Sequence, residues 1–171
     1  MTSKRGYPSF KGLQPASKRA SAAARGASKK ADTRCEAVLR RELSRRGIRY
    51  RLHAPGLPGR PDIVFLRQQV VVFCDGDFWH GRNLEQRIAK LQRGHNSAYW
   101  VAKVRRNVER DQQQKMALEN DGWMVLRMWE TDILRDAGWC ADLVAAAVGE
   151  RSDGRRQLAK QGCARAKISR L

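Results

Sequence analysis

The V-V-V-F stretch at 70–73 constrains the fold more than any other part of the chain. Consecutive β-branched and aromatic residues favour a strand that is buried on both faces, as the central strand of a helix-covered sheet is. A shorter apolar run covers 62–66, and the two glutamines at 68–69 predict a tight antiparallel turn between the runs. We therefore expect Asp62 and Cys74 at the same edge of a sheet.

Apolar residues recur at helical spacing on both sides of these runs, and Gly47 and Gly122 stand where glycine commonly ends a helix. The order of elements predicts an α/β fold, with a central mixed β-sheet flanked by helices. Besides the two central strands, we expect helices over 33–46, 84–95, 98–120 and 137–148, and strands over 48–53 and 123–129.

Basic residues outnumber acidic ones by 35 to 17, a formal net charge of +18, which predicts a polyanionic partner. Charge alone does not separate DNA from RNA or from an anionic membrane, although no basic amphipathic segment stands out. Residues 1–34 hold nine basic residues and one acidic residue, and residues 150–171 hold seven and two. We expect a disordered basic N-terminal arm over 1–33, a folded domain over 34–149 and a basic C-terminal tail over 150–171.

The cysteines form no C-x-x-C pair, so their spacing favours free thiols over a zinc site; they are Cys35, Cys74, Cys140 and Cys163. No apolar run has the length of a signal peptide or of a transmembrane helix. These two features predict a soluble protein of the cytoplasm.

The tetrapeptide G-R-P-D at 59–62 introduces the first candidate for chemistry. Pro61 fixes its own φ and pushes Arg60 towards an extended conformation, so that Asp62 stands at the mouth of an apolar strand. A carboxylate there is costly unless a charged or donor group meets it, and a divalent cation is one such partner. Arg60 and the backbone amides of the turn are the alternative partners.

The run C-D-G-D at 74–77 follows the central strand and brings further oxygen atoms to that edge. Mg²⁺ prefers oxygen ligands and keeps several waters. The carboxylate of Asp62 and a backbone carbonyl near Cys74 suit it, with Asp75 as a further candidate ligand. Asp75 and Asp77 are otherwise ordinary turn residues.

Three more side chains are candidates for proton transfer or for its support. His80 follows Cys74 by six residues and is placed to take a proton from water, although a lone histidine is more often structural. Glu36 and Asp111 lie near the apolar faces of their helices, where acids are uncommon unless paired or functional. Each is expected to support a metal-bound water, to orient His80, or to pair with an arginine.

Large aromatic side chains gather near these candidates. Planar rings wedge between base pairs and stack on bases, whereas packing in the protein core is the alternative role. Cationic side chains on the long helix are suited to phosphate contacts. The aromatic candidates are Phe78, Trp79 and Trp100, and the cationic ones are Lys103, Arg105, Arg106 and Arg110.

Four strings together resemble the very short patch repair (Vsr) endonucleases, a branch of the PD-(D/E)xK nuclease superfamily with an altered catalytic motif. They are L-P-G-R-P-D-I-V-F at 57–65, V-V-V-F-C-D-G-D-F-W-H at 70–80, Y-W-V-A-K-V-R-R-N-V-E-R-D at 99–111 and G-W-M-V-L-R-M-W-E at 122–130. The resemblance covers about residues 33–147, with order and spacing kept throughout. It implies a restriction-endonuclease-like fold.

The resemblance also implies an activity, a strand-specific nick beside a T·G mismatch in double-stranded DNA, made with two Mg²⁺ ions. It implies that Asp62 binds metal, that Cys74 offers its backbone carbonyl where a threonine is usual, and that His80 is the base. Glu36 and Asp111 match the positions of the family's two further acids. The positions of the family's wedging aromatics are those of Phe78, Trp79 and Trp100. The expected protein is a monomer, associated with the bacterial nucleoid and with other mismatch-repair proteins as further partners.

The chain departs from the family in two places. The family carries a structural zinc whose ligand positions here are Asp77, Arg82, Leu84 and Thr131. None of these is a good zinc ligand, so we expect no structural zinc. Asp75 stands where the family has a second histidine. Two alternatives follow, a related nuclease that cuts matched DNA in phage defence or in a mobile element, and a basic DNA-binding module that has lost catalysis.

Overall fold

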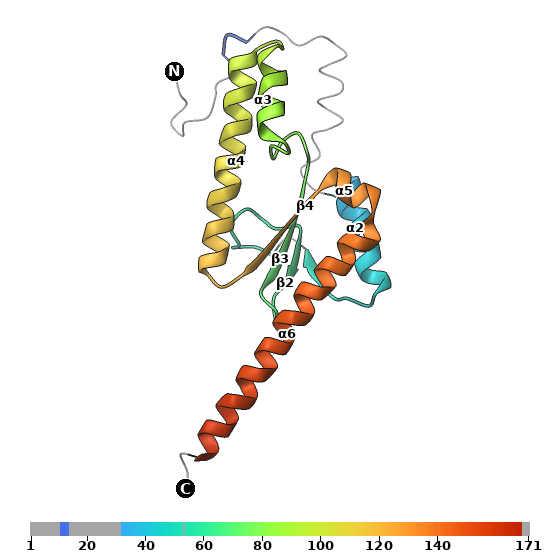
Figure 1. Ribbon diagram of the computed structural model, residues 1–171, viewed down its shortest axis with the longest axis vertical. Coiled ribbons are helices and arrows are strands. Elements are labelled where there is room, and N and C mark those ends of the chain that lie inside the picture. Colours follow the sequence, from blue (N-terminus) through green and yellow to red (C-terminus); the bar gives the residue numbers. More distant parts are fainter. Residues whose placement is uncertain (1–10, 14–31, 53, 169–171) are drawn as a thin grey trace.

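A four-stranded mixed sheet forms the centre of the computed structural model (Figure 1), which describes residues 11–13, 32–52 and 54–168, with side chains described only as far as residue 154. The strand order is β1-β2-β3-β4. The first two pairings are antiparallel, and β3 and β4 run parallel. The strands are β1 (Arg51–Leu52), β2 (Ile63–Phe65), β3 (Val70–Asp75) and β4 (Met124–Trp129).

Side-chain alternation along β2 and β3 builds a core on each face of the sheet. Val70 and Val72 belong to one buried cluster, and Val71 and Phe73 belong to the other. All four are buried, as expected for a central strand. The α/β fold with a central mixed sheet flanked by helices is therefore confirmed.

Helices cover both faces (Figure 1). The larger core lies between the sheet and α2 (Arg34–Arg45), α5 (Glu130–Arg135) and the first turns of α6 (Ala137–Ile168). On the other face, Leu118 of α4 (Ser97–Asn120) packs against the smaller cluster. The short helix α3 (Leu84–Gln92) packs beside α4 at the end away from that cluster.

Three local expectations are corrected. The expected strand over 48–53 is shorter, since β1 covers only Arg51–Leu52, and residue 53 lies outside the described residues. The turn between β2 and β3 spans four residues, 66–69, because Phe65 and not a later residue pairs with Val70. The helix α5 was not expected at all, because six residues are too few to show a helical period.

The last helix does not end at 148 but continues to Ile168 and projects away from the body of the molecule (Figure 1). A single glycine costs only about 1 kcal/mol in a helix, so Gly149 does not stop it. Beyond Gly149, Arg151 donates to the carbonyl of Gly122 at 2.7 Å, and Gln68 donates to Ser152 at 3.3 Å. These bonds tie α6 to the end of the sheet. The expected arm over 1–33 lies mostly outside the described residues.

No helix in the described ranges combines the length and the apolar character that a membrane crossing requires.

Candidate active site

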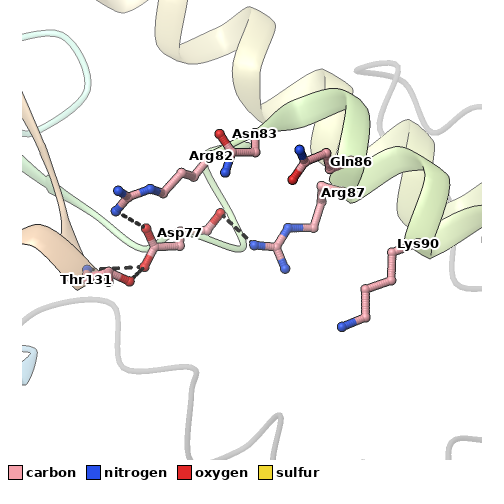
Figure 2. Close-up of a pocket in the computed structure, with 7 residues that line it drawn as sticks. All are labelled: Asp77, Arg82, Asn83, Gln86, Arg87, Lys90 and Thr131. Atoms are coloured by element: carbon pink, nitrogen blue, oxygen red, sulfur yellow. Dashed lines mark hydrogen bonds and ion pairs between the residues drawn. The ribbon is translucent and has the colours of Figure 1, made fainter.

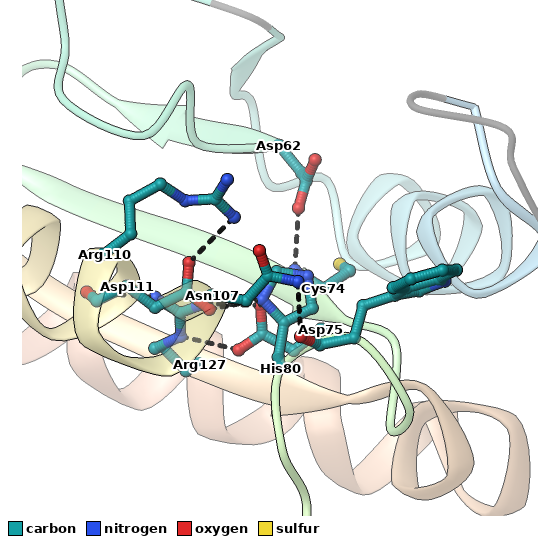
Figure 3. A network of polar contacts seen from close by, with 9 residues as sticks. Asp62, Cys74, Asp75, His80, Asn107, Arg110, Asp111 and Arg127 are labelled. Carbon is teal, nitrogen blue, oxygen red and sulfur yellow. Dashed lines mark hydrogen bonds and ion pairs between the residues drawn. The ribbon is translucent and has the colours of Figure 1, made fainter. Parts of the chain in front are cut away.

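The edge of the sheet where β2 starts and β3 ends joins Asp62 to Cys74 (Figure 3). The amide of Cys74 donates to Oδ2 of Asp62 at 2.7 Å, while the amide of Asp62 donates to the carbonyl of Val72 at 3.0 Å. The expected meeting of Asp62 and Cys74 at one edge is confirmed. The expected extended conformation of Arg60 is wrong, since its φ is 54°; its amide instead closes a turn onto Leu57.

At this edge of the sheet, Cys74 offers its backbone amide and carbonyl and not its thiol. In a strand the amide and the carbonyl of one residue face the same side, so the carbonyl of Cys74 faces the side on which Asp62 lies. The thiol points to the face of the sheet that α2 and α6 cover, where it packs against the larger core. Burial, followed by the charge of Asp62, raises the pKa of this thiol far above its usual range, so the thiol stays protonated.

The histidine of the F-W-H loop meets the acid of α4. Nδ1 of His80 lies 2.6 Å from Oδ2 of Asp111, and the His80 side chain retains 27% of its exposure. The amides of Trp79 and His80 both donate to the carbonyl of Gly76, which fixes the loop as a turn after β3. Asn107 of α4 donates to the carbonyl of Trp79 at 3.1 Å and holds the same loop from the helix side.

Arg127 of β4 connects the acids around this histidine (Figure 3). Its guanidinium donates to both carboxylate oxygens of Asp75, at 2.6 and 2.7 Å. It also lies 3.4 Å from Oδ2 of Asp111 and 3.3 Å from Nδ1 of His80. Because Nδ1 faces a carboxylate at 2.6 Å, the tautomer with the proton on Nδ1 is favoured, which leaves Nε2 as the atom that accepts or donates a proton.

Asp111 is ionised over a wide pH range. Burial opposes its ionisation, but the hydrogen bond with His80 and the charges of His80, Arg127 and Arg110 outweigh burial. The pKa of Asp111 is therefore below its ordinary value. Of the three roles expected for this acid, its contacts agree with two, since Asp111 lies against both His80 and Arg127.

Asp75 is buried, and its side chain is only 4% exposed. Both its oxygens accept from Arg127, and Oδ1 also lies 3.6 Å from Nδ1 of His80. These contacts favour Asp75 as a residue that holds Arg127 and His80 rather than as a metal ligand.

Glu36 lies at the start of α2 and closes a capping box with Thr33. Its carboxylate accepts from the amides of Asp32 and Thr33 at 3.0 and 3.2 Å and from the Thr33 hydroxyl at 2.7 Å. The structure therefore does not pair Glu36 with His80. Its charge does reach the sheet edge, since it contributes to the raised pKa of the Cys74 thiol after burial, Asp62 and Cys35.

The three aromatic candidates form one cluster on the F-W-H loop and the start of α4. Ring centroids of Phe78 and Trp79 lie 4.8 Å apart, and Trp100 lies 6.3 Å from the first and 6.2 Å from the second. All three side chains are partly exposed, so they are not a closed core. The ammonium group of Lys103 lies over the rings of Trp79, Tyr99 and Trp100 at 5.5 to 5.6 Å.

The other basic candidates follow α4 away from the aromatic cluster. Arg105 and Arg106 are exposed. Arg110 is partly exposed, and its guanidinium lies 3.5 Å from Oδ1 of Asp111. Positively charged side chains therefore follow α4 from the aromatic cluster to the His80 site.

A polar clasp holds the F-W-H loop against α5; we use this name for Asp77, Arg82, Thr131 and Asp132. Asp77 accepts from Arg82 at 3.0 Å and from the amide of Thr131 at 3.2 Å, and it also accepts from the Thr131 hydroxyl. Arg82 donates in addition to Asp132 at 2.9 Å. Three of these contacts are visible beside Arg87 in Figure 2. Burial opposes the charge of Asp77, but Thr131 and Arg82 leave its pKa below the ordinary value.

The donor set at the sheet edge suits Mg²⁺ in one specific way. Among the described residues there is no group of three or more His, Cys, Asp or Glu side chains that could hold a metal ion by itself. Mg²⁺, however, is commonly bound by one or two carboxylates together with waters and substrate phosphates. One carboxylate, Asp62, beside one strand carbonyl, Cys74, fits that mode and does not fit a cage made by the protein alone.

Arg127, Asn107 and Arg82 were missed by the reasoning from sequence. Arg127 lies in the R-M-W-E string and Asn107 in the R-R-N-V-E-R-D string, but no local pattern indicates that they reach Asp75 or the Trp79 carbonyl. One signal was available for Arg127, because a basic residue inside an apolar strand needs a buried acid as its partner. For Arg82, the sequence indicates only that a zinc ligand is missing at its position.

Comparison with known proteins gives consistent matches. A family model described as DNA mismatch endonuclease Vsr matches residues 13–86. The type II nicking enzyme V.NmeDIP of Neisseria meningitidis serogroup C is 38% identical over 119 residues, which are 70% of this chain and 79% of that protein. The type II nicking enzyme V.NaeI of Lentzea aerocolonigenes is 43% identical over 65% of this chain and 68% of its own length. The DNA mismatch endonuclease Vsr of Escherichia coli strain K12 is 35% identical over 58% of this chain and 62% of its own.

Proposed function

Because the chain belongs to the Vsr family and is thus a DNA endonuclease, we propose that it nicks one strand of double-stranded DNA beside a T·G mismatch, in very short patch repair and with Mg²⁺. The observation that carries this proposal is the 2.6 Å contact of His80 with Asp111 at the sheet edge that also holds Asp62. The relatives named as nicking enzymes and as a mismatch endonuclease support the single-strand cut and the target.

We propose that the carboxylate of Asp62 and the backbone carbonyl of Cys74 would hold Mg²⁺ together with a DNA phosphate, and that two Mg²⁺ ions would take part. When bound, Mg²⁺ neutralises negative charge on the phosphate and lowers the pKa of water. The protein then has two tasks at this edge. It must fix the position of the Asp62 carboxylate, for which the Cys74 amide serves at 2.7 Å, and it must provide a proton acceptor.

Nε2 of His80 is the proposed proton acceptor. With Nδ1 bonded to Asp111, this ring keeps one orientation, and the positive charge that it gains is balanced by the Asp111 carboxylate. Arg127 holds Asp75 beside the same ring and keeps the two buried acids from repelling each other. Asp111, Asp75 and Arg127 therefore act as positioning residues.

We propose that the aromatic cluster and the basic face of α4 bind the DNA. Phosphate contacts from Lys103, Arg105, Arg106 and Arg110 fix the position of the duplex, and their contribution is independent of sequence. Phe78, Trp79 and Trp100 wedge into the duplex, which costs a few kcal/mol of unstacking. A T·G pair is held less firmly than a matched pair, so the cost falls there. We further propose a monomer that acts at the nucleoid alongside other mismatch-repair proteins.

The test is a nicking assay on T·G and matched duplexes of one sequence, with Mg²⁺ and with EDTA. Asp62→Ala is expected to slow the nicking of T·G DNA by about 10³-fold, since a metal supplies several kcal/mol of charge stabilisation. Its DNA affinity is expected to stay within about threefold, because phosphate contacts dominate affinity. Glu150→Ala, which removes an exposed acid from α6, serves as the matched control.

Each other result of the nicking assay would indicate a different function for this chain. Equal cutting of matched and T·G duplexes would indicate a nuclease of phage defence or of a mobile element. Binding without a nick under any divalent metal would indicate a DNA-binding module that has lost catalysis. If Asp62→Ala nicks T·G DNA at the rate of the parent protein, Asp62 does not bind the catalytic metal.

A further inference from the structure

Arg110 differs from its basic neighbours on α4 because it lies at the candidate active site itself. Arg105 and Arg106 are exposed, whereas Arg110 is partly buried. The Arg110 guanidinium lies 3.5 Å from Oδ1 of Asp111. In Figure 3 the Arg110 side chain leaves α4 and points towards the segment that enters β2 at Asp62. Arg110 is therefore placed with the reacting groups and not with the outer surface of the helix.

Packing of α4 against the G-R-P-D turn explains this placement. A side chain at Gly59 would begin only 2.7 Å from Oε1 of Gln114, so the turn and the helix touch there. Residues four apart share one face of a helix, so Arg110 lies on the same face as Gln114, one turn nearer the start of α4. Asp62 follows Gly59 by three residues. The contact therefore directs Arg110 towards the turn that ends at Asp62.

The protein does not occupy all the donors of Arg110. Its Nε atom is buried and has no hydrogen-bond partner among the residues that the structure describes. Its contact with Asp111 at 3.5 Å is longer than a charge-assisted hydrogen bond, and His80 holds that carboxylate more closely, at 2.6 Å. The Arg110 side chain is 41% exposed, so an anion can reach its terminal nitrogens.

Arg127 shows what a satisfied guanidinium looks like at the same site. It donates to both oxygens of Asp75 at 2.6 and 2.7 Å, and its side chain is only 20% exposed. Arg127 is thus committed to the protein, whereas Arg110 keeps donors for a ligand. The two N–H groups at the end of a guanidinium match two oxygens of one phosphate.

We propose that the Arg110 guanidinium contacts the phosphate that is cut, whereas the other basic side chains of α4 contact flanking phosphates. The inference rests on the proposed function, since it needs DNA as the substrate and a cut at this site. It makes Arg110 a catalytic residue and not only a contribution to affinity.

The chemical role of Arg110 follows from the charge in this step. The water oxygen bonds to phosphorus, one water proton passes to Nε2 of His80, and the electron pair of the broken bond leaves with the sugar oxygen. Negative charge on the oxygens around phosphorus is stabilised by donors that are already in position. Arg110 balances this charge and offsets the repulsion between the phosphate and the carboxylates of Asp62 and Asp111.

The test is a cycle between Arg110 and single phosphates of the DNA, measured as the Kd of the full chain without divalent metal. Nicking by the parent protein first locates the cut in a T·G duplex. Further duplexes then carry one neutral methylphosphonate, at the cut or at a flanking phosphate. Arg110→Met keeps the apolar stem and is expected to weaken binding to the unmodified duplex by about tenfold, as the loss of one charge-assisted contact does.

On the duplex that is neutral at the cut, the penalty of Arg110→Met is expected to fall below twofold, because its charged partner is gone. Flanking methylphosphonates are expected to leave that penalty unchanged. Arg105→Gln provides the comparison, since its penalty is expected to disappear only with a flanking methylphosphonate. Arg41→Gln removes an exposed charge from α2, on the other face of the sheet, and is expected to change Kd by less than twofold on every duplex.

An equal penalty of Arg110→Met on every duplex would mean that Arg110 acts only through Asp111, and it would overturn the proposal. A penalty that disappears only with a flanking methylphosphonate, or no penalty at all, would overturn it as well. Where Arg110→Met fails to fold, Arg110→Gln takes its place in the cycle.

Single-turnover nicking at saturating DNA tests the catalytic role separately. Arg110→Met is expected to lower this rate by about 10²-fold or more, as the loss of one positioned donor does. Arg110→Lys keeps the charge but loses the planar pair of donors, so it is expected to restore Kd to within about threefold and the rate only in part. A parent-like rate for Arg110→Met at saturating DNA would contradict the catalytic role.

Nicking by the parent protein keeps the two proposals apart. If the parent nicks T·G DNA while the cycle shows no coupling at the cut phosphate, only the assignment of Arg110 fails. If the parent does not nick T·G DNA, the proposed function fails, and this inference fails with it.

Discussion

Nδ1 of His80 lies 2.6 Å from Oδ2 of Asp111, although the two residues are 31 positions apart in the chain. The histidine comes from a turn after the central strand, and the acid comes from the middle of the long helix on the opposite side of the site. Asp111 is therefore the residue through which the helix α4 controls the orientation of the imidazole ring.

Asp111→Asn is expected to slow nicking of T·G DNA by about 10²-fold or more, the range that general base catalysis contributes. The amide leaves His80 free to adopt the other tautomer and does not balance its positive charge. Single-turnover rates and the Kd for DNA are measured together, and the Kd is expected to change by less than threefold. Glu109→Gln, which neutralises an exposed acid of the same helix, is the control. If the single-turnover nicking rate of Asp111→Asn is close to that of the parent protein, Asp111 does not position His80 for catalysis.

The stability of the protein is expected to fall in acid partly through Asp111. The pKa of Asp111 is lowered in the folded protein, mainly by His80 once burial is overcome, so its ionised form stabilises the fold. That stabilisation is complete above the ordinary carboxyl pKa of about 3.9 and is lost as the pH falls through the lower folded value. Thermal unfolding of the parent and of Asp111→Asn is compared from pH 2.5 to 6. The difference in Tm should shrink towards the acid end; a constant difference would contradict the lowered pKa.

Arg127→Met is expected to destabilise the protein by about 3–5 kcal/mol, because it leaves the buried carboxylate of Asp75 without its cation. The double variant Asp75→Asn with Arg127→Met removes both charges and is expected to recover part of this loss. Urea unfolding measures both. Should the double variant be as unstable as the sum of the two single variants, the pair is not coupled as the 2.6 and 2.7 Å contacts indicate.

Glu36→Gln distinguishes the capping role of this residue from a catalytic one. Glutamine also completes a capping box, so the free energy of unfolding is expected to change by less than about 0.5 kcal/mol, whereas Thr33→Ala costs about 1 kcal/mol. Since both carboxylate oxygens of Glu36 already accept from the helix start, the nicking rate of Glu36→Gln is expected to fall by less than threefold. A loss of 10²-fold with unchanged stability would give Glu36 the catalytic role that the family resemblance implies.

Local patterns in the sequence were enough to predict contacts between elements that follow each other directly along the chain. The pairing of 62–65 with 70–73 followed from two apolar runs and a short connection, and it placed Asp62 beside Cys74 correctly. The ion pairs of Arg127 were not predictable in this way, because Asp75 and Arg127 meet only once β3 and β4 pair in parallel across 52 residues.

The end of the last helix was predicted least well. It was expected near residue 148, but the contacts of Arg151 and Ser152 with the end of the sheet support its continuation, and Gly149 costs only about 1 kcal/mol. Similarly, Glu36 was correctly placed near an apolar helix face, but the same position also lets it cap the helix. Burial of an acid therefore indicated that the acid has partners without indicating which partners.

The polar clasp has a consequence for how the F-W-H loop responds to its surroundings. The loop that carries Phe78, Trp79 and His80 is fastened to α5 by opposite charges and one hydroxyl group, all supplied by the chain itself. Such a fastening forms as soon as the polypeptide folds, and it loosens with rising ionic strength because its side chains are partly open to water. Concentrated salt therefore acts on this enzyme twice, by weakening its attraction to DNA and by loosening the loop that carries His80.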